Sequence, residues 1–470
     1  MDLSSGDLSG KVVVLGGGSV RTPLLIHGIA ESEAMIGIGE VALYDIDRKR
    51  VELMAVLCRE VAKRLGSSLR ITTPERIEDA VTGAKYIISS LRVGGGAARA
   101  RDEEVARKFG FAGQETTGPG GMAMALRTIP VTLRYAKVVE KYAPDAWFIN
   151  FTNPAGLITQ ALTAHTKLRV VGICDTPTEV FHKIAEELRE PREQVICNYA
   201  GLNHLGWVTS VEVRGKERIG EILGSDEAIR RLYPADLFAP ELLRSLKAIP
   251  TEYLFFYYSQ QRAFQNQATA GATRGGEVQK LENMVFRETA AAVAAGNASA
   301  ALDRHTAYLM QRSASYFRLE SRAESAMGVA ASESPDPFSA ETGYHRMALD
   351  VMSALASQEP HRVVVNVLNG RSIPDLDSDD IVEVPCQISS QGVKPMATGP
   401  LSHAVRGLVL AVKEYERLVV RAATEESADL ARMALVSLPI VGQWEAADQV
   451  VAGLVASDSE HLGYLRWTRR

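Results

Sequence analysis

Residues 168–179 read Leu168-Arg169-Val170-Val171-Gly172-Ile173-Cys174-Asp175-Thr176-Pro177-Thr178-Glu179, an apolar run followed at once by polar residues. The last four predict a capping box with proline at the first helical position. A strand therefore passes directly into a helix. Cys174 and Asp175 stand at the junction, the place where open α/β sheets bind their ligands. We expect an intracellular thiol there to take part in chemistry rather than to fill space.

Short β-rich runs alternate with helical patterns across the first 200 residues, which favours an α/β fold with a Rossmann-like doubly wound parallel sheet. The predicted strands are Lys11–Leu15, Val41–Tyr44, Tyr86–Ser90, Ala146–Phe151 and Leu168–Ile173. Because parallel strands point one way, the polar clusters that follow them are expected at one edge of the sheet. These clusters are Gly16-Gly17-Gly18-Ser19, Asp45, Arg92 with Gly94 to Gly96, Asn153-Pro154 and Cys174-Asp175.

The pattern becomes mixed beyond about residue 200, which predicts a second α+β domain. The length of 470 residues favours about two or three domains, and we place the boundary between 1–198 and 199–470. Further elements are predicted from local periodicity. They are β-like runs at Trp207–Val213, Arg362–Val367 and Ile381–Ile388, helices over Ala290–Leu302 and Val405–Val420, and a loop at Gly271–Gly276.

Composition excludes several classes of partner. The formal net charge is −5 and 46% of the residues are hydrophobic, so the chain lacks the basic excess that nucleic acid or anionic membranes require. The most apolar helix candidate carries charges at Arg406, Lys413 and Glu414, so it is not expected to span a membrane. Four cysteines without paired spacing and a polar start predict a reduced, cytoplasmic protein.

The first glycine cluster predicts a dinucleotide site. Gly16 and Gly18 follow a strand and precede an apolar helix, so the backbone there can approach a pyrophosphate. Arg21 occupies the place of the usual third glycine, and such a cluster by itself is often only a tight turn. Asp45, at the end of the next strand, is the acidic group expected on an adenosine ribose, and it favours NAD over NADP.

Two further segments are candidates for ligand contacts. Arg92 lies at the ligand edge beside three glycines, where a guanidinium can bind an anion with two hydrogen bonds; the alternative is a solvated basic face. The polar stretch Gly113-Gln114-Glu115-Thr116-Thr117-Gly118-Pro119-Gly120-Gly121 predicts a loop that closes over a ligand, or else a plain surface loop.

A metal site is the third candidate. His204 lies among apolar neighbours, where a histidine is more often part of the core than a ligand. With Cys174, however, it could hold a divalent metal and leave positions open for substrate oxygens. The aromatic run from Tyr253 to Tyr258 is typical of core; Tyr253 could act as a base only if a metal or Arg274 lowered its pKa.

Together these motifs resemble the NAD- and metal-dependent glycoside hydrolases of family 4, over nearly the whole chain. The motifs that carry the resemblance are Gly16-Gly17-Gly18-Ser19, Arg92-Val93-Gly94, Gly113-Gln114-Glu115, Asn150-Phe151-Thr152-Asn153-Pro154-Ala155-Gly156, Cys174-Asp175, Gly201-Leu202-Asn203-His204 and Val405-Arg406-Gly407-Leu408. The resemblance implies a lactate/malate-dehydrogenase-like fold in homodimers or homotetramers, and a phosphorylated disaccharide or glycoside as substrate.

The resemblance also implies a set of residue roles. Mn²⁺ would be held by Cys174 and His204, Tyr253 would be the base, and Asp175 would protonate the leaving oxygen. NAD⁺ would take a hydride from C3 of the sugar, C2 would lose its proton, the aglycone would be eliminated, and water would add before the hydride returns. The remaining implied contacts are NAD at Gly16, Gly18, Ser19 and Asp45, the 6-phosphate near Ser19 and Arg92, and substrate at Asn153 and Arg274.

Three departures from the family bear on the substrate: Arg21 in place of a tyrosine, Phe255-Phe256 in place of Arg-Tyr, and Asp175, which is typical of the phospho-α-glucosidases. The segment from Gly201 to Tyr253 still favours a 6-phospho-β-glucosidase. The alternatives are a 6-phospho-α-glucosidase or another family 4 glycosidase, an NAD-dependent 2-hydroxy-acid dehydrogenase, and a non-catalytic sensor of NAD or sugar phosphate.

Overall fold

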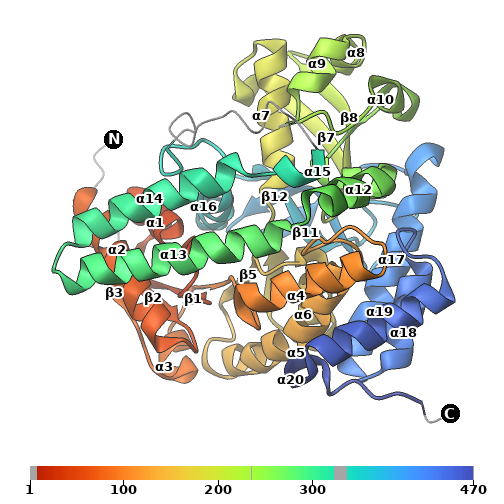
Figure 1. Cartoon of the computed structure of the whole chain (residues 1–470). Coiled ribbons are helices and arrows are strands. Elements are labelled where there is room, and N and C mark those ends of the chain that lie inside the picture. Colours follow the sequence, from red (N-terminus) through yellow and green to blue (C-terminus); the bar gives the residue numbers. More distant parts are fainter. Residues whose placement is uncertain (1–7, 234, 322–335, 469–470) are drawn as a thin grey trace.

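One continuous sheet runs through residues 8–233, 235–321 and 336–468, the part of the chain that the computed structural model describes. Its strand order is β10-β8-β7-β12-β11-β6-β5-β4-β1-β2-β3, with β13 beside β12 and β9 beside β8. Helices surround the sheet (Figure 1).

The N-terminal half of the sheet is parallel, as the sequence predicts. Its strands are β1 (Gly10–Leu15), β2 (Ile38–Tyr44), β3 (Arg70–Thr72), β4 (Tyr86–Ser89), β5 (Trp147–Asn150) and β6 (Arg169–Gly172). The order on either side of β1 reverses, which is the doubly wound arrangement. All five predicted strands are confirmed. The short edge strand β3 was not predicted, because three residues carry too little periodicity.

Helices that follow these strands pack into two separate groups, as right-handed crossovers in a doubly wound sheet require. One group holds α1 with α2, and the other holds α3 with α5 and α6. The bounds are α1 (Thr22–Ile36), α2 (Arg48–Arg64), α3 (Ile77–Val81), α4 (Gly95–Lys108), α5 (Gly118–Tyr142), α6 (Ala155–His165) and α7 (Thr176–Leu188).

The C-terminal half of the sheet is antiparallel and joins the parallel half where Asn366 pairs with Gly172. Its strands are β7 (Val195–Leu202), β8 (Leu205–Val213), β9 (Lys216–Glu217), β10 (Ile249–Pro250), β11 (His361–Leu368), β12 (Ile381–Ser389) and β13 (Gly392–Pro395). The predicted mixture of α and β structure is confirmed here. The boundary between 198 and 199 stays a prediction.

The helices of the C-terminal half are α8 (Ile219–Leu223), α9 (Asp226–Arg231), α10 (Pro240–Leu246), α11 (Phe255–Tyr258), α12 (Gln260–Ala270), α13 (Arg274–Ala294), α14 (Ala298–Ala314), α15 (Arg318–Ser321), α16 (Tyr344–Ala356), α17 (His403–Thr424), α18 (Ala428–Ser437), α19 (Trp444–Ser457) and α20 (Ser459–Leu462), with 3₁₀ turns η1 (Arg192–Gln194) and η2 (Glu252–Leu254). Helices α17 to α20 lie at the lower right of Figure 1 and α8 to α10 at its top, while α13 and α14 cross its centre and left side. The packing helix predicted at Val405–Val420 is α17.

Three local predictions are wrong. The predicted helix Ala290–Leu302 is interrupted, because α13 ends at Ala294, Gly296 adopts a φ of +75°, and Asn297 caps α14. The predicted loop at Gly271–Gly276 is shorter, because α13 already begins at Arg274. The capping box at Thr176 does not form: Asp175 is the N-cap and makes no side-chain cap bond.

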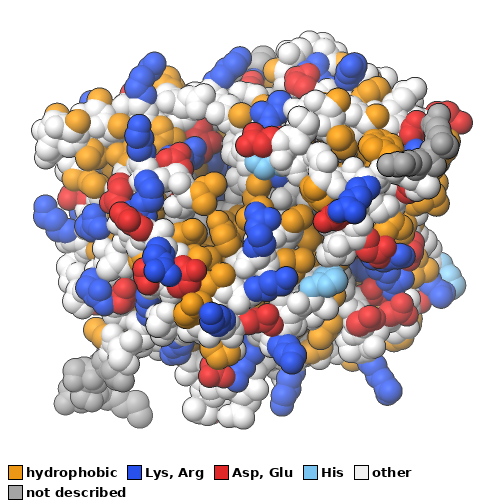
Figure 2. Space-filling model, turned by 90° about the horizontal axis from the view of Figure 1, so that it is seen from below, with side chains coloured by type: hydrophobic (Ala, Val, Ile, Leu, Met, Phe, Trp, Pro, Cys, Tyr) orange, Lys and Arg blue, Asp and Glu red, His pale blue; other side chains and the backbone are white. Residues whose placement is uncertain are grey.

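The outer surface fits the composition. On the face shown in Figure 2, Lys and Arg side chains are interspersed with Asp and Glu side chains. Among the described helices, none combines the length and the apolar character needed to cross a bilayer.

Candidate active site

The glycine loop after β1 is shaped by contacts with its neighbours. The backbone N–H groups of Gly16 and Gly17 each donate to the Tyr44 carbonyl at 2.9 Å, and Gly16 has a φ of +90°. A Cβ on Gly16 would lie 2.5 Å from the Ser90 carbonyl oxygen. Only glycine fits this approach, and the loop leads into the N-terminus of α1, where an anion is stabilised.

Asp45 closes this loop from the end of β2. Its carboxylate accepts hydrogen bonds at 3.0 Å from the backbone N–H groups of Gly18 and Asp47, one on each oxygen. Each oxygen can still accept another hydrogen bond, for example from a ribose hydroxyl. Ser19 lies partly buried in the turn before α1, so the predicted NAD residues lie in one loop and at the end of the neighbouring strand.

Cys174 and His204, the two predicted metal ligands, come from two different parts of the sheet. Cys174 follows β6, and His204 lies in the two-residue turn between β7 and β8 with a φ of +60°. Each is only 5% exposed. Burial raises the pKa of Cys174 well above 9 and lowers that of His204 to about 3, so the ring is neutral at neutral pH.

A third candidate, Tyr253, is a common neighbour of the first two. Its ring is stacked on His204, with centroids 3.8 Å apart and planes 4° from parallel. Burial raises the pKa of Tyr253, and the charges of Glu252 and of a Cys174 thiolate would raise it further. A nearby cation would reverse this effect, because it favours the phenolate.

This donor set fits a divalent cation. A thiolate and an imidazole suit a borderline metal, and a cation would also remove the proton that burial keeps on the thiol. Within the described ranges, no group of three or more His, Cys, Asp and Glu side chains could hold a metal. A metal held by Cys174 and His204 alone would keep coordination positions for substrate oxygens, as a catalytic site requires.

An acidic cluster that the sequence did not reveal lies beside Asp175. Glu252 accepts hydrogen bonds from the hydroxyls of Thr176 at 3.3 Å and Tyr316 at 3.2 Å. Burial, with a smaller contribution from the charge of Asp175, raises the pKa of Glu252 to about 7. Burial and the charge of Asp175 also raise the pKa of Glu179. Thr176 thus bonds to Glu252 instead of capping α7.

Arginines surround Glu115 in the loop before α5. Arg92 and Arg99 form ion pairs with Glu115 at 2.5 and 3.0 Å. Burial alone would raise the pKa of Glu115, but the two guanidinium groups outweigh it and hold the pKa well below its ordinary value. Arg312 lies near enough for its charge to repel those of Arg92 and Arg99. It donates a hydrogen bond to the Tyr308 hydroxyl at 3.2 Å, and it has no ion-pair partner among the described residues.

Asn153 and Arg274, the two remaining predicted substrate contacts, lie in different surroundings. Asn153 follows β5 at the same edge of the sheet, in a cis peptide bond with Pro154. Arg274 packs its guanidinium over the Tyr316 ring at 5.1 Å and donates to the Arg312 carbonyl at 3.1 Å. It therefore supports Tyr316 and Arg312, the residues next to the site.

Glu383 on β12 is another residue that sequence reasoning missed. It accepts hydrogen bonds from Tyr199 at 2.7 Å and from Asn203 at 3.0 Å, so it anchors the turn that carries His204. Burial raises the pKa of Glu383 to about 7. No motif indicates Glu383, because it lies on β12, far in sequence from the turn that it anchors.

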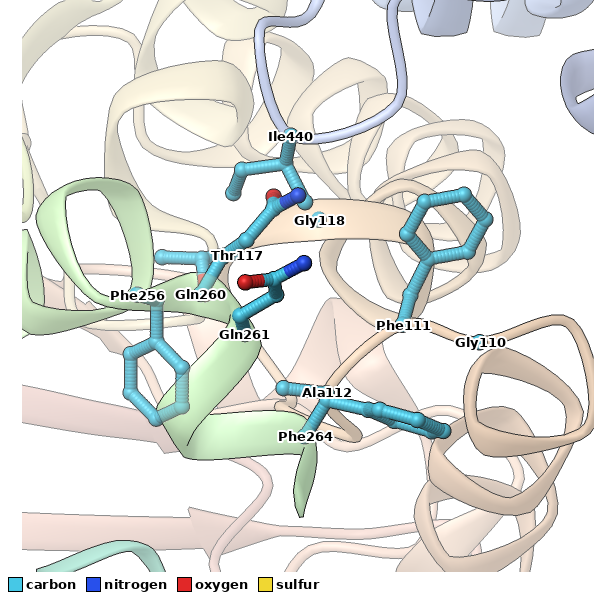
Figure 3. Close-up of a pocket in the computed structure, with 10 residues that line it drawn as sticks. All are labelled: Gly110, Phe111, Ala112, Thr117, Gly118, Phe256, Gln260, Gln261, Phe264 and Ile440. Atoms are coloured by element: carbon cyan, nitrogen blue, oxygen red, sulfur yellow. The ribbon is translucent and has the colours of Figure 1, made fainter. Parts of the chain in front are cut away.

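The predicted loop Gly113–Gly121 is only partly a loop. Gly118 to Gly121 form the buried first turn of α5, so the prediction that all nine residues close over a ligand is wrong for these four. A small pocket opens beside this turn (Figure 3). Its lining carries no charged side chain and consists of Gly110, Phe111, Ala112, Thr117, Gly118, Phe256, Gln260, Gln261, Phe264 and Ile440.

An α/β sheet that places a glycine loop beside a thiol, an imidazole and a phenol defines a protein that processes a small ligand. Residues 11–190 match the model of the family 4 glycosyl hydrolases, and residues 199–441 match that of the C-terminal domain of this family. The chain belongs to the family 4 glycosyl hydrolases. The predicted family and the prediction of a glycoside hydrolase are confirmed, and the dehydrogenase and sensor alternatives are set aside.

Relatives with curated names and solved structures agree with this assignment. A protein named probable 6-phospho-beta-glucosidase from Bacillus subtilis is 29% identical over 96% of this chain and 97% of its own length. The 6-phospho-beta glucosidase of Thermotoga maritima, solved with manganese, NAD⁺ and glucose-6-phosphate, has a TM-score of 0.79 at 28% identity, covering 96% of this chain and 99% of that one.

A member of the α-branch has the same TM-score at a slightly lower sequence identity. A 6-phospho-alpha-glucosidase from gut microorganisms, solved with NAD and glucose-6-phosphate, has a TM-score of 0.79 at 25% identity and covers 98% of this chain and 100% of that one. A metagenomic lactate dehydrogenase shares the fold at a TM-score of 0.52 and 12% identity, covering 88% of this chain and 99% of that one. The predicted dehydrogenase-like fold is thus confirmed.

Proposed function

We propose that the protein hydrolyses 6-phosphoglucosides, with a preference for the β-linked compounds, and that it uses NAD⁺ and a divalent cation such as Mn²⁺. The observation that carries this proposal is the stacking of Tyr253 on His204 beside Cys174, at the sheet edge that also holds the glycine loop. The names and bound ligands of the relatives described above support it.

The residues would divide the work by position. The backbone of Gly16, Gly18 and Ser19 and the carboxylate of Asp45 would hold NAD⁺, and Cys174 and His204 would hold the cation. When bound, NAD⁺ supplies a hydride acceptor and the cation a Lewis acid that makes a neighbouring C–H group acidic. Asn153 would orient the sugar next to the nicotinamide.

Tyr253 would remove the proton from C2 of the sugar, and Asp175 would give a proton to the departing oxygen. Both side chains are partly buried, which limits the competition of water with a positioned acid or base. Glu252 lies close enough to Asp175 for the charge of Asp175 to help raise the pKa of Glu252, so the proposed acid lies beside a second carboxyl group.

The 6-phosphate would lie among Arg92, Arg312 and the N-terminus of α1. Arg92 and Arg99 are already balanced by Glu115 and Glu103, whereas Arg312 contributes a cation without a carboxylate partner in the described chain. A doubly charged phosphate supplies the missing negative charge.

A 6-phospho-α-glucosidase is the second candidate, because Asp175 is the residue found in that branch. A panel of nitrophenyl α- and β-glucosides and galactosides, with and without the 6-phosphate, tests both candidates in the presence of NAD⁺ and Mn²⁺. Faster hydrolysis of the phosphorylated β-glucoside, abolished by chelation, supports the first proposal. Hydrolysis of the unphosphorylated compounds alone would contradict both.

We also propose that the enzyme acts in the cytoplasm as a homodimer or homotetramer. A phosphorylated sugar is retained inside a cell, and a buried free thiol at the site suits a reducing compartment. Light scattering of the purified protein measures the assembly; a monomer at all concentrations would contradict this part of the proposal.

A further inference from the structure

The loop before α5 is held by hydrogen bonds from both sides. The Gln267 side chain accepts from the Gly113 N–H at 2.7 Å and donates to the Gly113 carbonyl at 2.9 Å. Glu115 is fixed by the two arginines described above. The loop therefore has a defined position next to His204.

Gln114 is partly buried in this loop, and backbone donors determine the orientation of its side-chain amide. Its Oε1 accepts hydrogen bonds from the backbone N–H groups of Thr116 and Thr117, the latter at 2.8 Å. Only an oxygen can accept these bonds, so the amide cannot be reversed. The same Oε1 accepts the hydroxyl proton of Thr116, at 2.8 Å.

Thr116 then determines the tautomer of His204. The Thr116 Oγ1 lies 3.0 Å from Nδ1 of His204. Since a threonine hydroxyl has one proton and Thr116 donates it to Gln114, the oxygen can only accept from the ring. Nδ1 therefore carries the hydrogen, and Nε2 of the neutral ring keeps its lone pair.

We infer that Gln114 and Thr116 are positioning residues that hold His204 in the tautomer whose Nε2 can bind a cation. This inference rests on the proposed function, which makes His204 a metal ligand. A ligating histidine usually donates its second ring N–H to such a partner, and loss of the partner typically lowers metal affinity about 10- to 100-fold.

The test measures Mn²⁺ binding directly, by electron paramagnetic resonance of free Mn²⁺ in solutions of the protein saturated with NAD⁺. Thr116→Val, which keeps the shape of the side chain but removes the hydroxyl, is expected to weaken Mn²⁺ binding about 10- to 100-fold. Thr116→Ser, which keeps the hydroxyl, is expected to bind Mn²⁺ as tightly as the wild type. Thr424→Val is the matched control, because the Thr424 hydroxyl donates to the Val420 carbonyl at 3.0 Å within its own helix, α17. NAD⁺ affinity should be unchanged in all three variants.

A second measurement uses the metal-free wild-type protein and needs no folded Thr116→Val variant. Nitrogen-15 NMR of labelled histidine, with the His204 signal identified from His204→Asn, should show a protonated Nδ1 and an unprotonated Nε2. A protonated Nε2, or equal Mn²⁺ affinity in wild type and Thr116→Val, would overturn this inference but leave the proposed function standing. A wild-type protein that binds no Mn²⁺ would overturn the proposed function and the inference together.

Discussion

The phenol of Tyr253 lies flat against the imidazole of His204, with ring centroids 3.8 Å apart. One face of the His204 ring is therefore covered, and its edge remains for a cation. The same contact fixes the phenol hydroxyl close to Cys174 and Tyr316. The proposed base and the proposed metal ligand are thus positioned by one packing interaction, and substitutions can separate their roles.

Tyr253→Phe keeps the ring and removes the hydroxyl. We expect kcat to fall about 10²- to 10⁴-fold, the range for loss of a general base. Mn²⁺ affinity should stay near the wild-type value, because the stacked ring still supports His204. Steady-state kinetics together with a Mn²⁺ titration check this; a variant with normal kcat would show that Tyr253 is not the base.

Cys174→Ser replaces the thiol that we propose to bind the metal as a thiolate with a hydroxyl that does not ionise. Hydrolysis of a nitrophenyl 6-phosphoglucoside should fall by at least about 10³-fold, since a Lewis acid contributes several kcal/mol. NAD⁺ binding, followed by fluorescence or calorimetry, should remain within about twofold because the glycine loop is untouched. Full activity without added metal would contradict the assignment.

Arg312→Gln removes the guanidinium that lacks a carboxylate partner in the described chain. A hydrogen bond to a charged group is worth about 1.5–3 kcal/mol, so KM for the phosphorylated substrate should rise about 10- to 100-fold. Arg304→Gln, at an exposed position of the same helix, is the control and should leave KM unchanged. An equal KM in wild type and Arg312→Gln would place the phosphate elsewhere.

Glu252 should make stability depend on pH. Its pKa of about 7 in the folded protein exceeds the ordinary 4.5, so the folded state binds more protons between these values and stability falls as pH rises through this window. The wild-type free energy of unfolding should therefore fall between pH 5 and pH 8 by on the order of 2–3 kcal/mol more than that of Glu252→Gln. Urea unfolding at the two pH values measures this, and a parallel response of both proteins would refute it.

The parallel half of the fold could be predicted from sequence because buried parallel strands form continuous apolar runs, as in Val12 to Leu15 and Val170 to Ile173. Cys174, Asp45 and the glycine loop could be found for the same reason, since they follow such runs directly. The break at Gly296 was missed because alanine-rich helical composition continues on both sides of it.

Residues that act from a distance could not be predicted. Glu383 reaches the site through β12, and Arg312 through the end of α14; neither belongs to a local motif. Thr176 fits a capping box in sequence, but a buried carboxylate, Glu252, takes its hydroxyl in the folded chain. Such contacts depend on tertiary packing, which local periodicity does not contain.

The most direct test of the account is hydrolysis of a 6-phosphoglucoside in D₂O, with the product analysed by NMR. If Tyr253 removes the C2 proton during turnover, the glucose 6-phosphate released should carry solvent deuterium at C2. Product that keeps its original hydrogen at C2, formed at the normal rate, would contradict removal of this proton and with it the central claim.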